Sequence, residues 1–503
     1  MTAHLTVLPV ALPLLSAMLL LSKRHGYIRL KRLFSVASTA VLTLVSAALI
    51  ARAAGGEITY YALGNWQPPF GIVLVLDRLS ALMVLLTALL ALGCVIFACA
   101  GEDERGSNFH GLFQLQLMGI NGAFLTGDLF NLFVFFEVLL LASYALLLHG
   151  GGKARIQSAV HYVILNMAGS SLFLIAVGTL YGATGTLNMA DMAARISSLP
   201  AEREGLATAG ALLLLVVFSL KAAMLPLYFW MPRAYAAAPA PVAALFAVMT
   251  KIGVYAILRV YSLIFGEQAG GLANLGQGWV WWLALLTLAV ASVGVLASRD
   301  LRQLIAYLLL VSVGTLLAGI GMGSIAAVSA LLYYLVHTTL VTGALFLLAE
   351  MIGAQRGKAG TRIVKGRQMP QGQALSLAFF IAAVAVVGMP PLSGALGKVL
   401  VMDAAIGSQR LWLWPILLLS GLAAMVALSR AGSTLFWRSQ GGDDSGERLA
   451  RRQWAGVGLL LAFSPLLVAL AGAVSDYTLA TAEQLANPEA FIDALLIDAG
   501  GAP

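Results

Sequence analysis

Cysteine and charge are both scarce in this chain, and each scarcity excludes a class of protein. Only two cysteines occur, Cys94 and Cys99, and both lie in one apolar stretch at a spacing that fits neither a structural metal site nor an iron–sulfur cluster. The sequence also lacks a glycine-rich phosphate loop, a His-Glu-x-x-His motif and a nucleophile elbow. We therefore expect no metal, no cofactor, and no redox or hydrolytic chemistry in the chain itself.

The low charge content predicts an all-α integral membrane protein. Charged residues make up 10% of the 503 residues and hydrophobic residues 60%, with a mean hydropathy of +0.91, whereas soluble domains carry about 25% charged residues. Because backbone polar groups must find internal partners in lipid, apolar segments of spanning length are expected to be helices. Fourteen such segments are predicted, at 4–22, 33–53, 79–100, 109–126, 128–148, 157–181, 207–230, 239–265, 278–298, 301–320, 325–350, 373–405, 411–436 and 455–474.

The net charge of +8 indicates membrane orientation and not nucleic-acid binding, because the basic clusters follow the odd-numbered spans. These clusters are Lys23, Arg24, Arg29, Lys31 and Arg32; Lys153 and Arg155; Arg299 and Arg302; Arg356, Lys358, Arg362, Lys365 and Arg367; and Arg438, Arg448, Arg451 and Arg452. The positive-inside rule then predicts a multi-pass protein of the bacterial inner membrane with both termini on the outer side. The first span has its basic residues after the apolar run, so we expect a retained helix and not a cleaved signal peptide.

The seventh and twelfth spans are the two that proline and glycine interrupt. The seventh contains Pro226 and Pro232, and the twelfth contains Gly388, Pro390, Pro391 and Gly394. Interrupted helices at corresponding positions of two repeats indicate a transport site near the midplane, and an offset of five spans makes the repeats inverted. The predicted regions are helices 1–3 in 1–107, a first five-helix repeat in 108–266, a second in 267–440, and helix 14 with an outer C-terminal tail in 441–503.

Four charged residues lie inside apolar spans, which indicates an ion path. Lys221 stands in the run 211–226, where an ammonium costs roughly 2.5 to 3.5 kcal/mol on insertion scales. About twelve apolar residues precede it, which places it about 18 Å deep, beyond the reach of a snorkelling lysine. Glu137, Lys251 and Lys398 repeat this costly placement.

Several segments of the sequence resemble one known family. The resemblance is carried by NFHGLFQLQLMGINGAFLTGDLFNLFVFFEVLLLASY (108–144), LKAAMLPLYFWMPRAYAAAPAPVAALFAVMTKIGVYAILRV (220–260), SRDLRQLIAYLLLVSVG (298–314), GMPPLSGALGKVL (388–400) and ANPEAFIDALL (486–496). They are similar to the D-type subunits of Mrp-type (Pha- or Mnh-type) multisubunit monovalent cation/proton antiporters, over nearly the whole chain. The resemblance implies fourteen helices with two inverted five-helix units, and export of Na⁺ or K⁺ in exchange for inward protons. It also implies assembly with subunits of the A, B, C, E, F and G types. The antiporter-like subunits of respiratory complex I and of membrane hydrogenases share this fold and are the alternative.

The resemblance also implies roles for the buried charges. Glu137 and Lys221 correspond to the family's central pair. In such a pair the nearby carboxylate favours the charged form of the lysine, and desolvation favours its neutral form. Lys251 and Lys398 correspond to the middle and outer stations of a proton path. Each of these residues also has a structural alternative. Glu137 would be a carboxylate neutralised by a neighbour. The two lysines would be counter-ions for helix ends that are exposed at a break. The M-type subunit of complex I typically has a glutamate at the position of Lys398.

His337 is the one histidine at the middle of a span, and histidine titrates near neutrality. Relatives use a histidine here to link lysines, and a satisfied core histidine is the alternative. Many relatives have a lysine where this chain has Thr342, so Thr338, Thr339 and Thr342 are candidates for ordering water. His161 is a weaker candidate at the mouth of a path, or simply interfacial.

Overall fold

The computed structural model describes residues 3–22, 27–440 and 448–500, and nearly all of them lie in helices. Lys23 and Arg24 of the first basic cluster, and the last residues of the C-terminal tail, fall outside the described residues. The prediction of an all-α membrane protein is confirmed. Eleven described helices are long and apolar enough to cross a membrane, and α1 and α14 are shorter apolar helices.

Each of the fourteen predicted spans coincides with one helix or with two consecutive helices. The helices are α1 (Leu8–Ser22), α2 (Ile28–Ala53), α3 (Arg78–Ala98), α4 (Phe109–Leu125), α5 (Leu129–Leu147), α6 (Lys153–Thr184), α8 (Ala201–Ala222) with α9 (Trp230–Ala237), α10 (Ala240–Leu263), α11 (Gln277–Ala297), α12 (Leu301–Met322), α13 (Ile325–Gln355), α14 (Gly372–Val387) with α15 (Ser393–Asp403), α16 (Ser408–Gly432) and α17 (Arg451–Ala469). Three further helices are α7 (Met189–Ser197), α18 (Ala471–Leu485) and α19 (Pro488–Gly500). The short helical turns are η1 (Ala3–Thr6), η2 (Leu63–Asn65), η3 (Glu102–Glu104), η4 (Gly270–Leu272), η5 (Gly357–Ala359) and the π-helical η6 (Ser433–Trp437).

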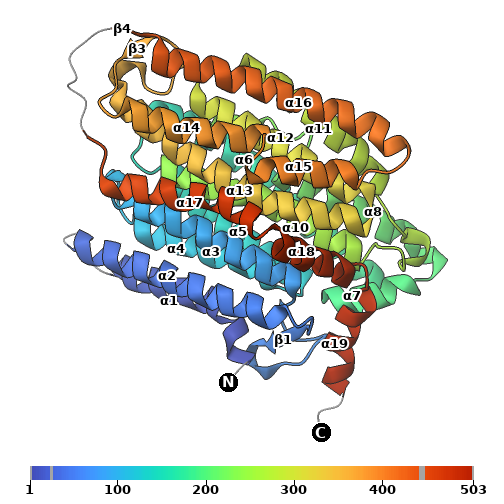
Figure 1. Cartoon of the computed structure of the whole chain (residues 1–503). Coiled ribbons are helices and arrows are strands. Elements are labelled where there is room, and N and C mark those ends of the chain that lie inside the picture. Colours follow the sequence, from blue (N-terminus) through green and yellow to red (C-terminus); the bar gives the residue numbers. More distant parts are fainter. Residues whose placement is uncertain (1–2, 23–26, 441–447, 501–503) are drawn as a thin grey trace.

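Two small sheets mark opposite ends of the bundle (Figure 1). β1 (Thr59–Ala62) pairs antiparallel with β2 (Val73–Leu76), with Thr59 opposite Leu76, near both chain termini. β3 (Gly366–Arg367) pairs in parallel with β4 (Ser439–Gln440) at the far end. We call these the terminal end and the basic end.

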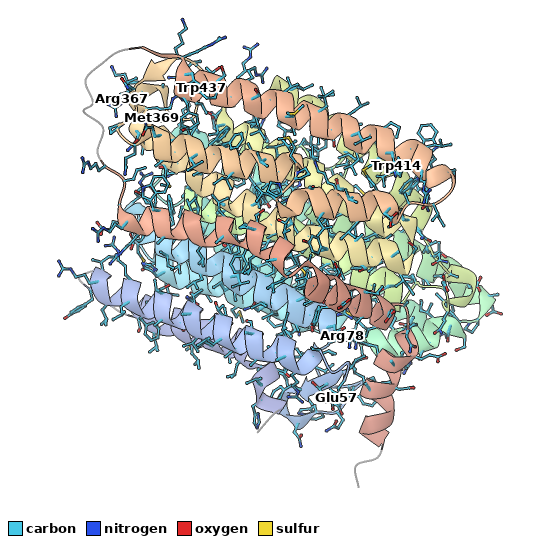
Figure 2. The ribbon with its side chains drawn as sticks, viewed as in Figure 1. Glu57, Arg78, Arg367, Met369, Trp414 and Trp437 are labelled. Atoms are coloured by element: carbon cyan, nitrogen blue, oxygen red, sulfur yellow. The ribbon has the colours of Figure 1, made fainter. Side chains whose placement is uncertain are left out.

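The basic end collects the described basic clusters. Arg367 lies in β3, and Figure 2 shows it near Trp437, far from Glu57 and Arg78. Ion pairs between helix ends and the 99–108 connection hold this end together, such as Arg32 with Asp103 at 2.7 Å and Arg105 with Glu350 at 3.5 Å. A single basic end is what the positive-inside pattern requires.

The centre of the bundle is formed by α10 and α13, whose most apolar stretches are buried throughout. α13 packs against α3, α10, α12, α14, α15, α17 and α18. α10 packs against α3, α4, α8, α12 and α13. The two helices that carry Lys251 and His337 are therefore the most enclosed in the fold.

Both predicted interruptions separate two helices. α8 ends at Ala222, and Ala223 takes a left-handed backbone conformation at φ 61° before Pro226. α14 ends at Val387, followed by Gly388 at φ 84° and then Pro390 and Pro391. Because proline cannot donate a backbone hydrogen bond and its ring crowds the preceding turn, neither helix continues.

The C-terminal region differs from the prediction. The last span was expected to end near 474, yet α18 continues the direction of α17 to Leu485 and packs against α13 and α3. Thr478 and Thr481 are buried there, and their hydroxyls donate to the backbone oxygens of Ser475 and Tyr477. A hydroxyl bonded to its own helix loses much of its polarity, which a hydropathy profile does not register.

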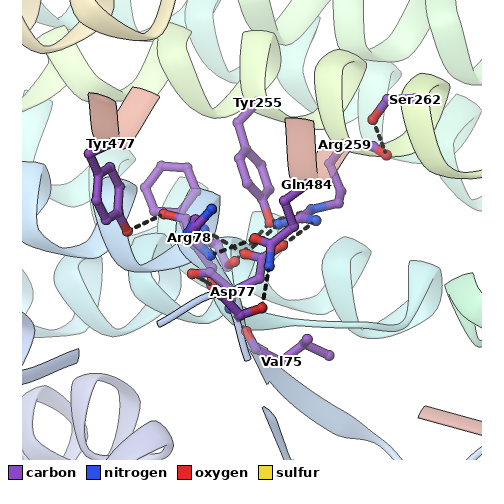
Figure 3. A network of polar contacts seen from close by, with 11 residues as sticks. Val75, Asp77, Arg78, Tyr255, Arg259, Ser262, Tyr477 and Gln484 are labelled. Carbon is purple, nitrogen blue, oxygen red and sulfur yellow. Dashed lines mark hydrogen bonds and ion pairs between the residues drawn. The ribbon is translucent and has the colours of Figure 1, made fainter. Parts of the chain in front are cut away.

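A buried ion pair fixes the terminal end of α3 and α10 (Figure 3). Asp77 caps α3 by accepting from the Ser80 backbone nitrogen at 2.8 Å. It also accepts from both terminal nitrogens of Arg259, at 2.6 and 2.8 Å. The neighbouring Arg78 donates to the Ala480 backbone oxygen at 3.0 Å, which ties α18 to the same point. Asp77 and Arg78 therefore act as anchors.

We expect Asp77→Ala to lower the free energy of unfolding by about 3 to 5 kcal/mol, because it leaves the Arg259 guanidinium buried without its partner. Glu104→Ala is the matched control. It removes a carboxylate that is 55% exposed and pairs with Arg32, a change worth about 1 kcal/mol or less. Thermal unfolding of the purified complex measures both, and equal effects would contradict the anchor role.

Candidate functional site

The first buried charged group lies between α5, α6 and α8. Lys221 occupies the last turn of α8 and is 5% exposed. Its Nζ donates to Asn166 Oδ1 at 3.1 Å and lies 3.5 Å from the Asn166 backbone oxygen. Nζ also stands 5.9 Å from the centroid of the Phe136 ring. A neutral amide and an aromatic face therefore hold the ammonium.

Glu137 approaches this ammonium through a hydroxyl. Ser170 donates to Glu137 Oε1, and Ser170 follows Asn166 by one turn of α6. Within the described residues, Glu137 and Lys221 make no direct ion pair. The carboxylate and the lysine therefore each contact a polar side chain of α6, and these two side chains lie one turn apart.

Lys251 lies in the middle of α10 and is completely buried. Its Nζ donates to Ser312 Oγ on α12 at 3.4 Å. In the described part of the chain, Nζ donates to no carbonyl of a helix end, which is the contact that the counter-ion alternative requires. The buried ammonium has only a hydroxyl partner among the described residues.

Gly253 brings Lys251 close to the first break. A Cβ at this position would lie 2.3 Å from the Ala222 backbone nitrogen and 2.7 Å from the Lys221 carbonyl carbon. Only glycine permits this approach of α10 to the end of α8. Lys221 and Lys251 therefore stand on helices in backbone contact.

His337 faces the second break. Its Nδ1 pairs with Ser393 Oγ at 2.7 Å, and Ser393 pairs with Ser464 Oγ of α17 at 2.9 Å. A Cβ on Gly394 would lie 2.8 Å from His337 Nε2. The imidazole is thus fitted against the first turn of α15.

Lys398 occupies α15 and donates to the Val387 backbone oxygen at 2.7 Å. Val387 ends α14, so this ammonium satisfies a carbonyl that the break leaves free. The contact fits the structural alternative as well as a place in a proton path.

Buried hydroxyls lie between the Lys251 region and His337. Thr315 follows Ser312 by one turn of α12, and Tyr334 precedes Thr338, next to His337, by one turn of α13. Thr338 and Thr342 are buried, and the Thr339 hydroxyl donates to the Leu335 backbone oxygen at 2.7 Å. The candidate site is therefore one row of polar groups that crosses the bundle from α5 to α15.

One sequence candidate lies outside this row. His161 is exposed on α6, and its Nδ1 pairs with the Gln157 backbone oxygen at 3.0 Å. Sequence reasoning instead missed the neutral members of the row, which are Asn166, Ser170, Ser312, Ser393 and Ser464. A signal existed for two of them, because Asn166 and Ser170 are polar, one turn apart and inside an apolar span.

One described group has the composition of a metal site, at the basic end. Ligand atoms of Cys99, Asp103 and His110 lie within 4.8 Å of one another. Burial by itself would raise the pKa of Asp103, but hydrogen bonds from Arg32 and His110 lower it to about 2. Arg32 engages both carboxylate oxygens at 2.7 Å, so Asp103 is committed to this guanidinium and the group does not fit a cation.

Comparison with known proteins assigns the family. Residues 126–423 match the family model described as NADH:quinone oxidoreductase/Mrp antiporter, TM. The chain belongs to this family. The matched range includes Glu137, Lys221, Lys251, His337 and Lys398, so every charged member of the polar row and its histidine lie within the part of the chain that the family model covers, while Ser464 lies beyond it.

Relatives in the antiporter family match over nearly their whole length. The D-type subunit of a probable K⁺/H⁺ antiporter from Rhizobium meliloti is 43% identical over 96% of each chain. The D-type subunit of a Na⁺/H⁺ antiporter from Bacillus subtilis is 38% identical over 98% of this chain and 99% of the relative.

Solved structures show the same fold. A chain of the Mrp complex from Dietzia sp. aligns with a TM-score of 0.86 and 25% identity, covering 98% of this chain and 99% of that one. A chain of an archaeal membrane-bound sulfane sulfur reductase aligns at 0.85 with 26% identity, covering 98% and 99%. A chain of Thermus thermophilus complex I aligns at 0.80 with 26% identity, covering 95% and 99%.

Proposed function

We propose that this chain is the proton-translocating subunit of a multisubunit monovalent cation/proton antiporter, which exports Na⁺ or K⁺ in exchange for inward protons. The observation that carries the proposal is the row of buried lysines, each with a neutral oxygen partner on a different helix. In this proposal a proton passes from one titratable group to the next through hydroxyls and ordered water. The relatives named as antiporter subunits support the same function.

The order of the proton path follows the order of the row. Glu137 biases Lys221 through Ser170 and Asn166, Lys251 follows through the α8–α10 contact, and His337 leads to Lys398. Thr338, Thr339 and Thr342 assist by ordering water. The membrane potential supplies about 2.3 kcal/mol per charge per 100 mV, enough to drive steps that differ by a few kcal/mol.

Two inverted repeats would account for the paired breaks. In this proposal the two units are residues 108–266 and 267–440, and they are surrounded by 1–107 and 441–503. The two breaks are kept open by Pro226 in the first unit and by Pro390, Pro391 and Gly394 in the second. The partners are subunits of the A, B, C, E, F and G types in the inner membrane.

The alternative is an antiporter-like subunit of a redox-driven pump, which the similarity to sulfane sulfur reductase and complex I chains favours. Everted vesicles that contain the whole complex distinguish the two. We expect Na⁺ or K⁺ to collapse a pH gradient formed by ATP hydrolysis, without any electron donor. Proton movement that occurs only with an electron donor would support the alternative.

We propose that both termini face outward. A cysteine replacing Glu489, which is exposed at the terminal end, should react with an impermeant reagent in intact cells. A cysteine replacing Lys365, exposed at the basic end, should react only after permeabilisation. Labelling of both from one side would mean that a span has been miscounted.

A further inference from the structure

A second polar row leads from the Glu137–Lys221 pair toward the basic end. Tyr144 follows Glu137 by two turns of α5, and Tyr162 precedes Asn166 by one turn of α6. The two rings meet edge to face with centroids 5.4 Å apart. Ser143 Oγ pairs with the Tyr162 hydroxyl at 2.9 Å in a buried contact.

Tyr235 of α9 extends this row. Its ring lies beside Trp230 and Phe246 at 6.1 and 5.3 Å between centroids, and Tyr162 packs against the same two rings at 5.3 and 6.2 Å. Tyr235 is completely buried, and its hydroxyl has no hydrogen-bond partner in the described part of the chain. Because a buried hydroxyl without a partner is destabilising, an ordered water is the expected partner.

The row ends at a cluster of charges around Glu102. Two residues beyond Tyr235, the Ala237 backbone oxygen accepts from Arg155 Nε at 3.1 Å. Arg155 also donates to the His149 backbone oxygen at 2.7 Å, and His149 Nε2 lies 2.9 Å from the Glu102 backbone oxygen. Through Arg155 and His149, these contacts link the end of α9 to the η3 turn.

In the described structure, one oxygen of the Glu102 carboxyl has a partner and the other does not. Its side chain is 7% exposed, and Oε1 pairs with Arg105 at 2.7 Å. Within the residues described, Oε2 is buried and has no partner. Burial raises the pKa of Glu102, and Arg105, Arg302 and Arg155 oppose that rise. The charged and titratable groups around it are Asp103, Arg105, His149, Arg155, Arg302 and Glu350.

We propose that Ser143, Tyr162 and Tyr235, with ordered water, conduct protons between the Glu137–Lys221 pair and Glu102, and that Glu102 exchanges them with the inner solution. The proposal rests on the proposed function and adds its inner route. Each hydroxyl accepts a proton on a lone pair as it passes its own proton on, so no hydroxyl changes its charge. Glu102 Oε2 takes up the proton and releases it to water beside the half-exposed Arg105.

Tyr235→Phe is the deciding variant, because it removes only the unpaired hydroxyl. If that hydroxyl were merely structural, its loss would leave transport unchanged. A proton-conducting hydroxyl should cost roughly tenfold or more in exchange rate, with normal assembly. The control is Tyr261→Phe, which removes a hydroxyl that donates to the Ala211 backbone oxygen at the terminal end and should transport like wild type.

Glu102→Gln and Glu104→Gln form a second matched pair on one turn. Glu102→Gln should lower exchange roughly tenfold and flatten its dependence on the inner pH. Glu104 is exposed and pairs with Arg32, so its variant should keep the wild-type pH profile. Wild-type exchange in Tyr235→Phe, or an unchanged pH profile in an assembled Glu102→Gln complex, would overturn the route. If Lys221→Ala is inactive in the same assay, the failure concerns this route and the proposed function stands.

Discussion

Lys221→Ala should abolish cation-driven proton exchange while the complex still assembles in normal amount. The substitution removes a group that must pick up and release protons, so we expect a loss of about hundredfold or more. Assembly should survive because, among the described residues, the ammonium is held by Asn166 and an aromatic face, and removing a buried charge also removes its desolvation penalty.

Glu137→Ala should also abolish cation-driven proton exchange, because Glu137 acts on the protonation of Lys221. Ser170 would then donate to no carboxylate, and Lys221 would lose the charge that biases its protonation. Lys153→Ala, which changes an exposed lysine at the start of α6, is the control and should exchange like wild type. Exchange at the wild-type rate in assembled Lys221→Ala vesicles would contradict the relay.

His337→Gln should assemble normally and lose most transport across the pH range, by about hundredfold. Glutamine keeps a hydrogen-bonding group near Ser393 but cannot titrate. His337→Lys should retain some transport at high pH, where a desolvated lysine still releases its proton. Exchange is measured in vesicles over a range of pH, with the exposed His4→Gln as control.

A His337→Gln complex that exchanges cations like wild type would assign the histidine to core packing. The path would then cross between Lys251 and Lys398 through water and the hydroxyls at 338–342. The buried hydroxyls of Thr315, Tyr334 and Thr338 are the groups that this water would meet.

The sequence revealed the charged part of the site because a charge in lipid is costly wherever it lies. Glu137, Lys221, Lys251 and Lys398 stand out from their apolar surroundings without any knowledge of helix orientation. The proline and glycine clusters located both breaks for a similar reason, since few other residues interrupt a spanning helix. These signals are local in the chain.

The neutral members of the row were missed because their signal is not local. Ser312 and Ser393 differ from lipid-facing serines only in the direction they face, and serine hydroxyls commonly bond to their own helix. The extension of α18 was missed for the same reason at Thr478 and Thr481. Helix direction and packing partners are set by contacts such as that of Gly253 with Ala222, which join residues far apart in sequence.

The most direct test of the proton-carrying role is exchange by Lys221→Arg in vesicles that contain the assembled complex. Arginine keeps the positive charge and the donors to Asn166, but its guanidinium does not release a proton in proteins. We expect no Na⁺- or K⁺-dependent proton movement from this variant, although the charge is preserved. Wild-type exchange by Lys221→Arg would show that the charge acts only as a fixed counter-ion, and would contradict a relay through Lys221.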